Sequence, residues 1–315
     1  MTTPSVDPKV GRLESFRQQM VQQIEEAGGR HDESSLYDGE PGDLGLCGGP
    51  GSMSWEINGD FASIVIAGAG AILMEVLHPS VMAGVYTQSS YREDPLRRAR
   101  NTLGYVLRTT FGNTKAATGV IESVKRVHSR INGTREDGMP YRALDPELIA
   151  WVHTSIPMGI MNAYPKYTRP LSIEEKNRYL KEQALIGRMG GADWVPETVS
   201  ELADYMEKMR HQMAFNEQTR DFLDFLYGRV EGAGLSRFEL FDRWASVQSS
   251  MSLMPEWGRR LTGTYQPEWM LKSWIWPHER LKARIVRWVY PELPCRAMAM
   301  ARAKGVPPVK STIAA

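Results

Sequence analysis

Two of the six histidines fall on apolar helix faces, where an imidazole could serve as an iron ligand. His128 is spaced three, four and three positions along a stripe with Ile121, Val124 and Ile131, so it belongs to an apolar face and we expect it to point inward. A core histidine satisfied by one hydrogen bond is the simpler interpretation. The alternative is a neutral imidazole that donates its free electron pair to a haem iron.

The second inward histidine repeats this pattern. His153 shares an apolar stripe with Ile149, Ile156 and Ile160, so it too should face the core. Pro157 lies in the same helix, where it should produce a kink and free the carbonyl of His153 or its neighbour. No two histidines are three or four residues apart, which leaves a site with one histidine per helix.

Arg98 and Thr102 are four residues apart and share one face of a predicted helix. A guanidinium and a hydroxyl aimed into one pocket could orient a bound diatomic molecule. The other interpretation is a threonine bonded to its own helix and an arginine in water.

A basic block surrounds His128. Between positions 92 and 130 the sequence has nine Lys or Arg residues against three Asp or Glu residues. Arg126 and Arg130 flank the histidine, and the two propionates of haem need such cationic partners. A solvated charged face is the common alternative for a charge run.

The whole chain is nearly neutral and poor in cysteine. It has 315 residues, with 38 Lys and Arg against 37 Asp and Glu, so its net charge indicates neither nucleic acid nor an anionic membrane as a partner. Two cysteines exclude a disulfide framework, a Cys-based zinc site and covalently attached haem. With a polar N-terminus that lacks the pattern of a secretory signal, this predicts a cytoplasmic protein. Nine Trp and seventeen Met residues would suit either an enclosed apolar ligand or an ordinary helical core.

The most apolar run, at 61–77, predicts a buried helix. Glu75 interrupts it, and it is shorter than the roughly 18 to 20 residues of a membrane span, so we expect no transmembrane segment. Gly68 and Gly70 within it lack the third glycine of a dinucleotide loop, because Leu73 takes that position. They indicate close helix packing instead.

Helical periodicity and helix-start signals follow one another along the chain, and strand alternation is nearly absent. They predict one all-α domain at 53–304, preceded at 1–52 by a helix (10–27) and a glycine-rich arm, and followed by a flexible tail at 305–315. The predicted helices of the domain are 61–77, 79–89, 95–110, 115–131, 146–161, 173–187, 196–212, 217–227 and 238–254.

Several segments occur in an order that resembles one family. They are "WEINGD" (55–60), "LHPSVMAGV" (77–85), "YREDPLRRARNT" (91–102), "VHSRINGT" (127–134), "YRALDPELIAWVHTS" (141–155) and "YTRPLS" (167–172). Together they resemble the catalytic domain of rubber oxygenases (latex clearing proteins) and of the related MpaB-type oxygenases, over about residues 50–300. The resemblance implies a globin-like all-α core around non-covalent haem b, and dioxygen chemistry on apolar, alkene-containing substrates. By motif, it implies His128 as the proximal iron ligand, Arg98 and Thr102 as distal residues, and His153 as a second haem-pocket histidine.

One position departs from the family pattern. Rubber oxygenases have a lysine directly before the distal threonine, and this chain has Asn101. An amide can hydrogen-bond a ligand on the iron but is a poor sixth ligand, so we expect an open or water-ligated distal site and a substrate other than polyisoprene. The sequence thus predicts a haem-b oxygenase that uses dioxygen on a small or medium apolar substrate. A haem protein for sensing, storage or peroxide chemistry and a cofactor-free helical interaction module are the alternatives, and the oligomeric state is open.

Overall fold

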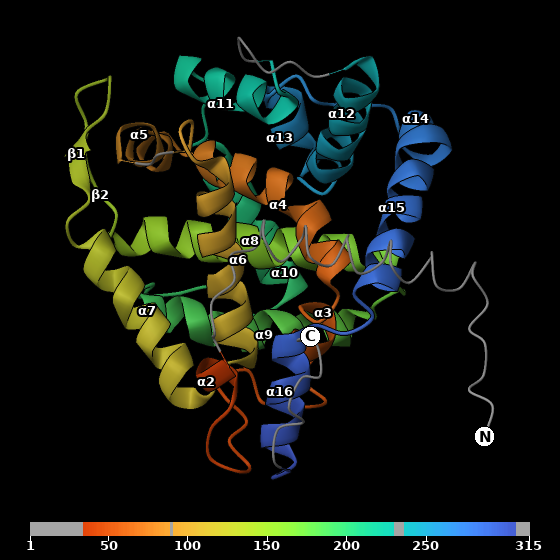
Figure 1. The fold of residues 1–315 in the computed structure, drawn as a ribbon. Coiled ribbons are helices and arrows are strands. Elements are labelled where there is room, and N and C mark those ends of the chain that lie inside the picture. The colour runs from red at the N-terminus through yellow and green to blue at the C-terminus, as the bar shows by residue number, and fades with distance from the viewer. Residues whose placement is uncertain (1–33, 89–90, 230–235, 307–315) are drawn as a thin grey trace.

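The computed structural model describes residues 34–88, 91–229 and 236–306 (Figure 1). The described chain is mostly helical and forms a single domain, as predicted, while the expected helix at 10–27 and most of the expected tail lie outside the described residues. Its elements are α2 (Ser34–Tyr37), α3 (Met53–Ile57), α4 (Phe61–Val76), α5 (Pro79–Gln88), α6 (Pro95–Phe111), α7 (Thr114–His128), β1 (Asn132–Thr134), β2 (Pro140–Arg142), α8 (Pro146–Tyr167), α9 (Ile173–Gly190), α10 (Val199–Arg210), α11 (Glu217–Tyr227), α12 (Arg237–Met251), α13 (Glu256–Leu261), α14 (Glu268–Met270), the π-helical turn η1 (Leu271–Ile275), α15 (Trp276–Val289) and α16 (Pro294–Ala303).

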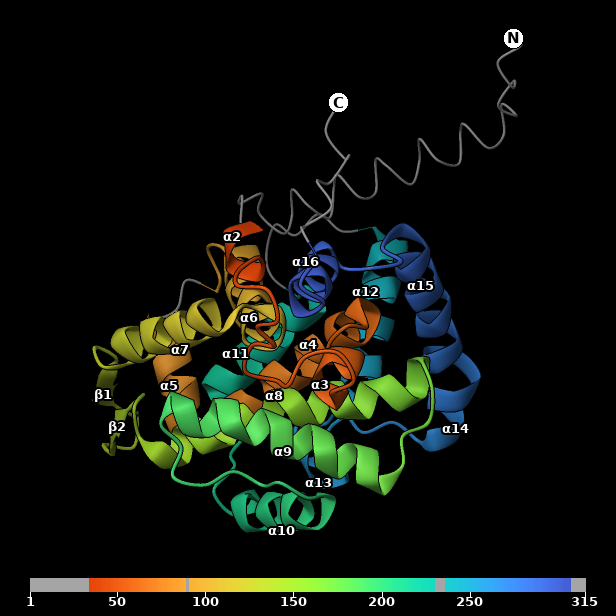
Figure 2. The ribbon, with the colours of Figure 1, turned by 90° about the horizontal axis from the view of Figure 1, so that it is seen from below.

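Helices α4 and α8 cross at the centre of the molecule, and the other helices cover them (Figures 1 and 2). Small residues let the central helices approach closely. A Cβ atom on Gly70 would lie 2.3 Å from the carbonyl oxygen of Ser250 in α12, and the Gly70 amide donates to the Ser250 hydroxyl at 2.6 Å. Gly159 of α8 meets Ala71 of α4 in the same way, at 3.1 Å. The packing interpretation is therefore confirmed for Gly70 and wrong for Gly68, where a Cβ atom would meet nothing within 4 Å.

The predicted helix starts are confirmed by their caps. The Asp94 carboxylate accepts the amide of Arg97 at 3.0 Å and begins α6, and Asp145 does the same for α8 with the amide of Glu147 at 2.9 Å. Ser172 and Glu175 form a capping box at the start of α9, in which each side chain accepts the backbone amide of the other residue. Local sequence alone specifies these three starts.

Several helix ends differ from the prediction, and two of these differences, at α7 and α8, bear on the site. Helix α7 ends at His128 instead of residue 131, because the chain beyond it turns into the hairpin of β1 and β2, in which Gly133 pairs with Tyr141. Helix α8 continues to Tyr167 instead of ending at residue 161. Tyr164 and Tyr167 are buried in the core, and their packing offsets the cost of the backbone hydrogen bond that Pro165 cannot donate. His128 therefore lies at the C-terminal end of its helix.

The glycine-rich arm packs on α16 through one buried arginine. The Arg302 guanidinium donates to four backbone carbonyl oxygens: Tyr37, Asp43 at 2.8 Å, Phe111 at 3.1 Å and Gly112 at 3.3 Å. These carbonyls belong to the arm and to the end of α6. Arg302 therefore ties the arm and the end of α6 to α16.

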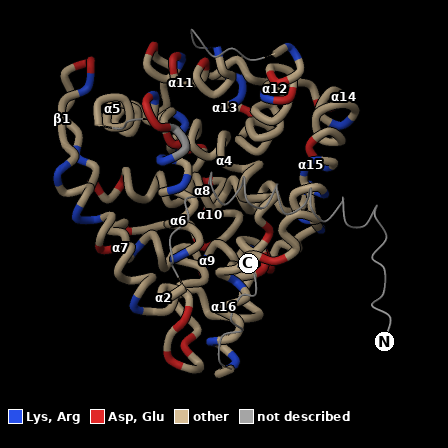
Figure 3. The backbone as a smooth tube through the Cα atoms, in the orientation of Figure 1, with Lys and Arg blue, Asp and Glu red and all other residues tan. Residues whose placement is uncertain are grey.

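Charged residues lie mainly on the peripheral elements, and the central helices carry few of them (Figure 3). In the described part of the chain, no single helix is long and apolar enough to cross a membrane; α4 and α5 meet that test only as a pair bent by 108°.

Candidate functional site

Helix α6 presents one line of polar residues toward its neighbours. Arg98, Thr102 and Tyr105 follow at spacings of four and three, so they share a helix face, and all three are half-buried. The Thr109 hydroxyl donates to a backbone carbonyl oxygen of its own helix at 2.8 Å. Among the described residues, the Thr102 hydroxyl makes no such hydrogen bond. Asn101 is exposed. The structure thus separates Asn101 from the other two predicted distal residues.

His128 is the last residue of α7 and is half-buried. Burial lowers the pKa of its imidazole, and the positive charge of Arg98 lowers that pKa further. The imidazole is therefore neutral at neutral pH, which is the form that binds a metal. A hollow of about 260 Å³ opens beside it, lined by His128, Ser129, Ile131, Asn132, Arg142 and Leu144.

His153 of α8 fits into a space that two glycines of α9 leave open. A Cβ atom on Gly190 would lie 3.0 Å from His153 Nε2, and one on Gly187 would lie 3.3 Å from His153 Cβ. The Tyr105 hydroxyl lies 3.5 Å from the same Nε2, with the two rings edge to face. Burial, and then the charge of His128, lower the pKa of His153 to about 4. His153 is therefore a second neutral imidazole.

Glu75, near the end of α4, is a candidate functional residue that the motif analysis did not assign. Its side chain is buried, and its Oε1 atom makes no hydrogen bond to any described residue. Burial raises the pKa of this carboxyl to about 8, although the charge of Arg98 opposes the shift. The signal in the sequence was a single carboxylate within the most apolar run of the chain.

A second buried polar atom lies next to His153. The Thr154 side chain is almost fully buried, and within the described residues its Oγ1 atom has no hydrogen-bond partner. A buried hydroxyl or carboxyl without a partner costs free energy on the order of 1–3 kcal/mol. Such an atom calls for a partner that the described residues do not supply, such as a water molecule or a bound group. Glu75 and Thr154 thus fit a site for a polar group inside an apolar core.

The basic residues of the prediction lie outside this inner set. Arg126 and Arg130 are exposed, at the end of α7 and just after it. Two positions along a helix differ by about 200°, so Arg126 points away from the face that carries His128. Arg142 of β2 instead shares the hollow with His128. It is a cation that the sequence analysis did not select, because hairpin pairing brings it there.

The helices α4, α6, α7 and α8 thus supply polar groups that are linked electrostatically: Glu75, Arg98, His128 and His153. The charge of Arg98 acts on both Glu75 and His128, and His128, when protonated, acts on His153. In the part of the chain that the structure describes, no three His, Cys, Asp or Glu side chains gather as a metal site.

Buried groups with shifted pKa values, such as Glu75 and His153, are common at functional sites. A family model described as "ER-bound oxygenase mpaB/B'/Rubber oxygenase, catalytic domain" matches residues 55–304. The chain therefore belongs to this family of oxygenases, and the resemblance found in the motifs is confirmed. No curated protein and no solved structure matches the chain significantly.

Proposed function

We propose that the protein is a haem-b-dependent oxygenase that uses dioxygen on a small or medium apolar substrate, with an alkene as the reacting group. Membership of an oxygenase family supports the reaction class. The observation that carries the proposal is the pair of neutral imidazoles on neighbouring helices: His153 lies against Tyr105 of α6 at 3.5 Å, and His128 is half-buried at the end of α7.

The residues present fit haem as the cofactor. The neutral imidazole of His128 would hold the iron through a ring nitrogen, and no cluster of further protein ligands would be needed. Arg142 in the neighbouring hollow and the exposed Arg130 would provide cations for the propionates, whereas Arg126 points away from His128. We extend this to the globin-like arrangement that the family resemblance implies, with α6, α7 and α8 around the cofactor.

When bound, the haem supplies the redox-active iron at which dioxygen is activated. The protein's own residues would then orient the oxygen atoms and the substrate. Arg98 can donate through its guanidinium and Thr102 through its hydroxyl, from adjacent turns of α6. Because Asn101 is exposed, we assign the orienting hydrogen bonds to Arg98 and Thr102.

Glu75 gives the site a proton donor. With a pKa of about 8, its carboxyl is mostly protonated at neutral pH, so it can donate a hydrogen bond or a proton. Once ionised, the carboxylate would face the positive charge of Arg98, which stabilises it. Glu75 can therefore hold a proton on Oε1 before the reaction and release it during the reaction. The neutral His153, which lies against Tyr105, would keep the far wall of the site uncharged.

Isotope incorporation tests this function. Haem-supplied protein would be incubated with a panel of apolar alkenes under oxygen-18, and the products analysed by mass spectrometry. We expect labelled carbonyl or hydroxyl products, a loss of roughly 100-fold in rate for Thr102→Ala or Arg98→Leu, and near wild-type rates for Asn101→Ala as the matched control.

Other outcomes would contradict the proposal in different ways. A haem-bound protein that labels no organic product would instead be a sensor, storage or peroxide-handling protein. A protein that takes up no haem would be a helical interaction module. Equal losses for Asn101→Ala and Thr102→Ala would contradict the assignment of roles on α6.

A further inference from the structure

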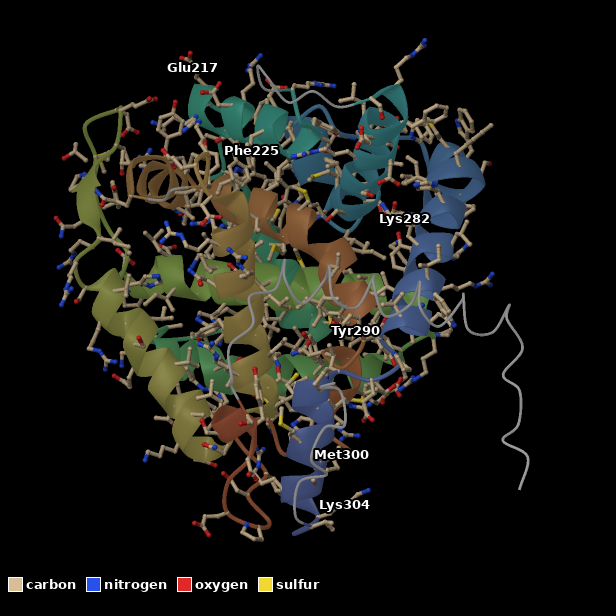
Figure 4. The ribbon with its side chains drawn as sticks, in the orientation of Figure 1. Glu217, Phe225, Lys282, Tyr290, Met300 and Lys304 are labelled. Atoms are coloured by element: carbon tan, nitrogen blue, oxygen red, sulfur yellow. The ribbon has the colours of Figure 1, made fainter. Side chains whose placement is uncertain are left out.

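The outer side of the C-terminal helices exposes large apolar side chains. We call this surface the tryptophan face and define it by six residues that are 40% to 68% exposed: Phe241, Trp269, Trp274, Leu281, Ile285 and Trp288. They lie on α12, α14, the π-helical turn and α15, at the right-hand edge of the view in Figure 1. Figure 4 shows ring-bearing side chains standing out from this edge.

The segments of this face converge on a shallow apolar hollow. It has a volume of about 230 Å³, and its lining includes Phe241, Trp244, Trp269 and Trp274. Phe241 and Trp244 stack, with ring centroids 6.0 Å apart. The face therefore joins two separate parts of the chain, α12 and the α14–α15 segment, in one surface.

The π-helical turn orients the tryptophans outward. Leu271 and Ile275 are buried, and Trp276 donates from its indole nitrogen to the Ser252 hydroxyl at 3.1 Å. These three residues hold the turn against α12. Trp269 and Trp274, by contrast, are 64% and 68% exposed, although an indole ring is among the most apolar side chains.

Helix α15 continues the face as an amphipathic helix. Trp274, Leu281, Ile285 and Trp288 follow at spacings of seven, four and three, so they form one stripe along the helix. The opposite side packs inward: Glu279 and Ala283 are buried. The stripe thus runs along a helix whose other side is already packed.

Positive charge surrounds the stripe. Between residues 237 and 288 the chain has nine Lys or Arg residues against five Asp or Glu residues, an excess of four in a protein whose net charge is +1. Arg280 and Arg284 flank the stripe on α15 and are exposed. The segment that carries the face is therefore net positive.

The acidic residues of this segment are already partnered. Asp242 accepts from Lys282 at 3.0 Å and from His278 at 2.9 Å, between α12 and α15, where Figure 4 labels Lys282. Glu268 pairs with Lys272 at 2.9 Å, and the remaining acidic groups bond Arg260, Ser236 or Ser246. Arg284 has no such acidic neighbour among the described residues.

We propose that the tryptophan face docks on the surface of an anionic lipid bilayer. A helix with Trp and Leu on one side and Lys or Arg beside them lies in the membrane interface, with its apolar side at the boundary of headgroups and acyl chains. Indole rings favour this depth because they are amphipathic, and arginines add attraction to anionic headgroups. The proposal does not rest on haem or on the oxygenase reaction.

Vesicle co-sedimentation of the full-length protein tests the proposal. Vesicles of phosphatidylcholine with phosphatidylglycerol should bind the protein, and vesicles of phosphatidylcholine alone should bind it more weakly. The double variant Trp269→Ser, Trp274→Ser should lower the partition coefficient at least tenfold, since burial of each large apolar side chain is worth more than that factor. Arg280→Gln with Arg284→Gln should remove the preference for anionic vesicles, as should high salt.

A matched control separates docking from folding. Trp194 is 49% exposed and lies between α9 and α10, away from the tryptophan face, so Trp194→Ser should leave vesicle binding unchanged. All substituted side chains are exposed, so the far-ultraviolet circular dichroism and the unfolding temperature should stay near wild type.

Three results would overturn the proposal. One is equal sedimentation of the wild type and the Trp269 and Trp274 double variant. Another is a concentration-dependent dimer in light scattering that the double variant abolishes, because the face would then bind a second copy of the chain. The third is weak acrylamide quenching of Trp274 in the absence of vesicles, which would show that another part of the chain covers the face.

Discussion

Glu75 should make the stability of the protein fall as the pH rises, and Glu75→Gln should remove that dependence. Burial raises the pKa of this carboxyl from 4.5 to about 8 in the folded protein. Between these values the folded state keeps a proton that the unfolded state has released. Folding then takes up a proton, so the free energy of unfolding decreases with rising pH through this window.

The size of the effect follows from the shift. Each pKa unit corresponds to about 1.36 kcal/mol, so the wild type should lose on the order of 3 kcal/mol of stability between about pH 5 and pH 8 through this group. The amide of Glu75→Gln has nearly the same shape and does not ionise. At about 2–4 °C per kcal/mol, the variant should unfold several degrees above the wild type at pH 8 and at nearly the same temperature at pH 5.

Thermal unfolding followed by circular dichroism across this range measures the difference. Glu207→Gln is the control, because Glu207 is an exposed carboxylate that pairs with Arg210 at 3.1 Å. Its curve should run parallel to that of the wild type. Parallel curves for Glu75→Gln and the wild type would refute the reasoning, since Glu75 would then be ionised in the folded protein throughout.

Two further predictions concern packing around the site. Gly190→Ala should lower the free energy of unfolding by about 1–2 kcal/mol, because the new Cβ atom would press on His153 Nε2. The control Gly68→Ala places its Cβ atom where nothing lies within 4 Å, so it should be neutral or slightly stabilising. A Gly190→Ala variant as stable as the wild type would contradict the close fit of His153. Arg302→Met should cost roughly 3–5 kcal/mol in denaturant titration, because buried carbonyl oxygens lose their donor. The exposed control Arg260→Met should cost under about 1 kcal/mol, and similar losses for both arginines would argue against the Arg302 contacts.

Local signals in the sequence predicted much of the fold. The caps at Asp94, Asp145 and Ser172 are short-range interactions, so residue type and spacing suffice to place them. The end of α7 was predicted three residues late, because the pairing of Gly133 with Tyr141 depends on residues that follow the helix in the chain. Apolar spacing in the sequence predicts which face of a helix is buried. It does not predict where a helix ends when the end depends on pairing with residues further along the chain.

The candidate site was predictable only in part for a related reason. His153 fits its predicted inward position, because helix periodicity specifies a face. Glu75 stood out in the sequence, but its raised pKa depends on the packing of several helices around α4. The many tryptophans suggested an enclosed ligand or an ordinary core, whereas four of the nine are exposed, three of them on the tryptophan face. Composition gives the number of tryptophans but does not say which of them are exposed.

An absorption spectrum of the purified, haem-supplied protein tests the central claim most directly. We predict a Soret band that shifts on reduction with dithionite and again on addition of carbon monoxide, because the amide of Asn101, which is also exposed, would be a poor ligand. His128→Ala should lose or change this spectrum, while His211→Ala, at an exposed position after α10, should keep it. A protein without a Soret band, or a His128→Ala variant with the wild-type spectrum, would contradict the account.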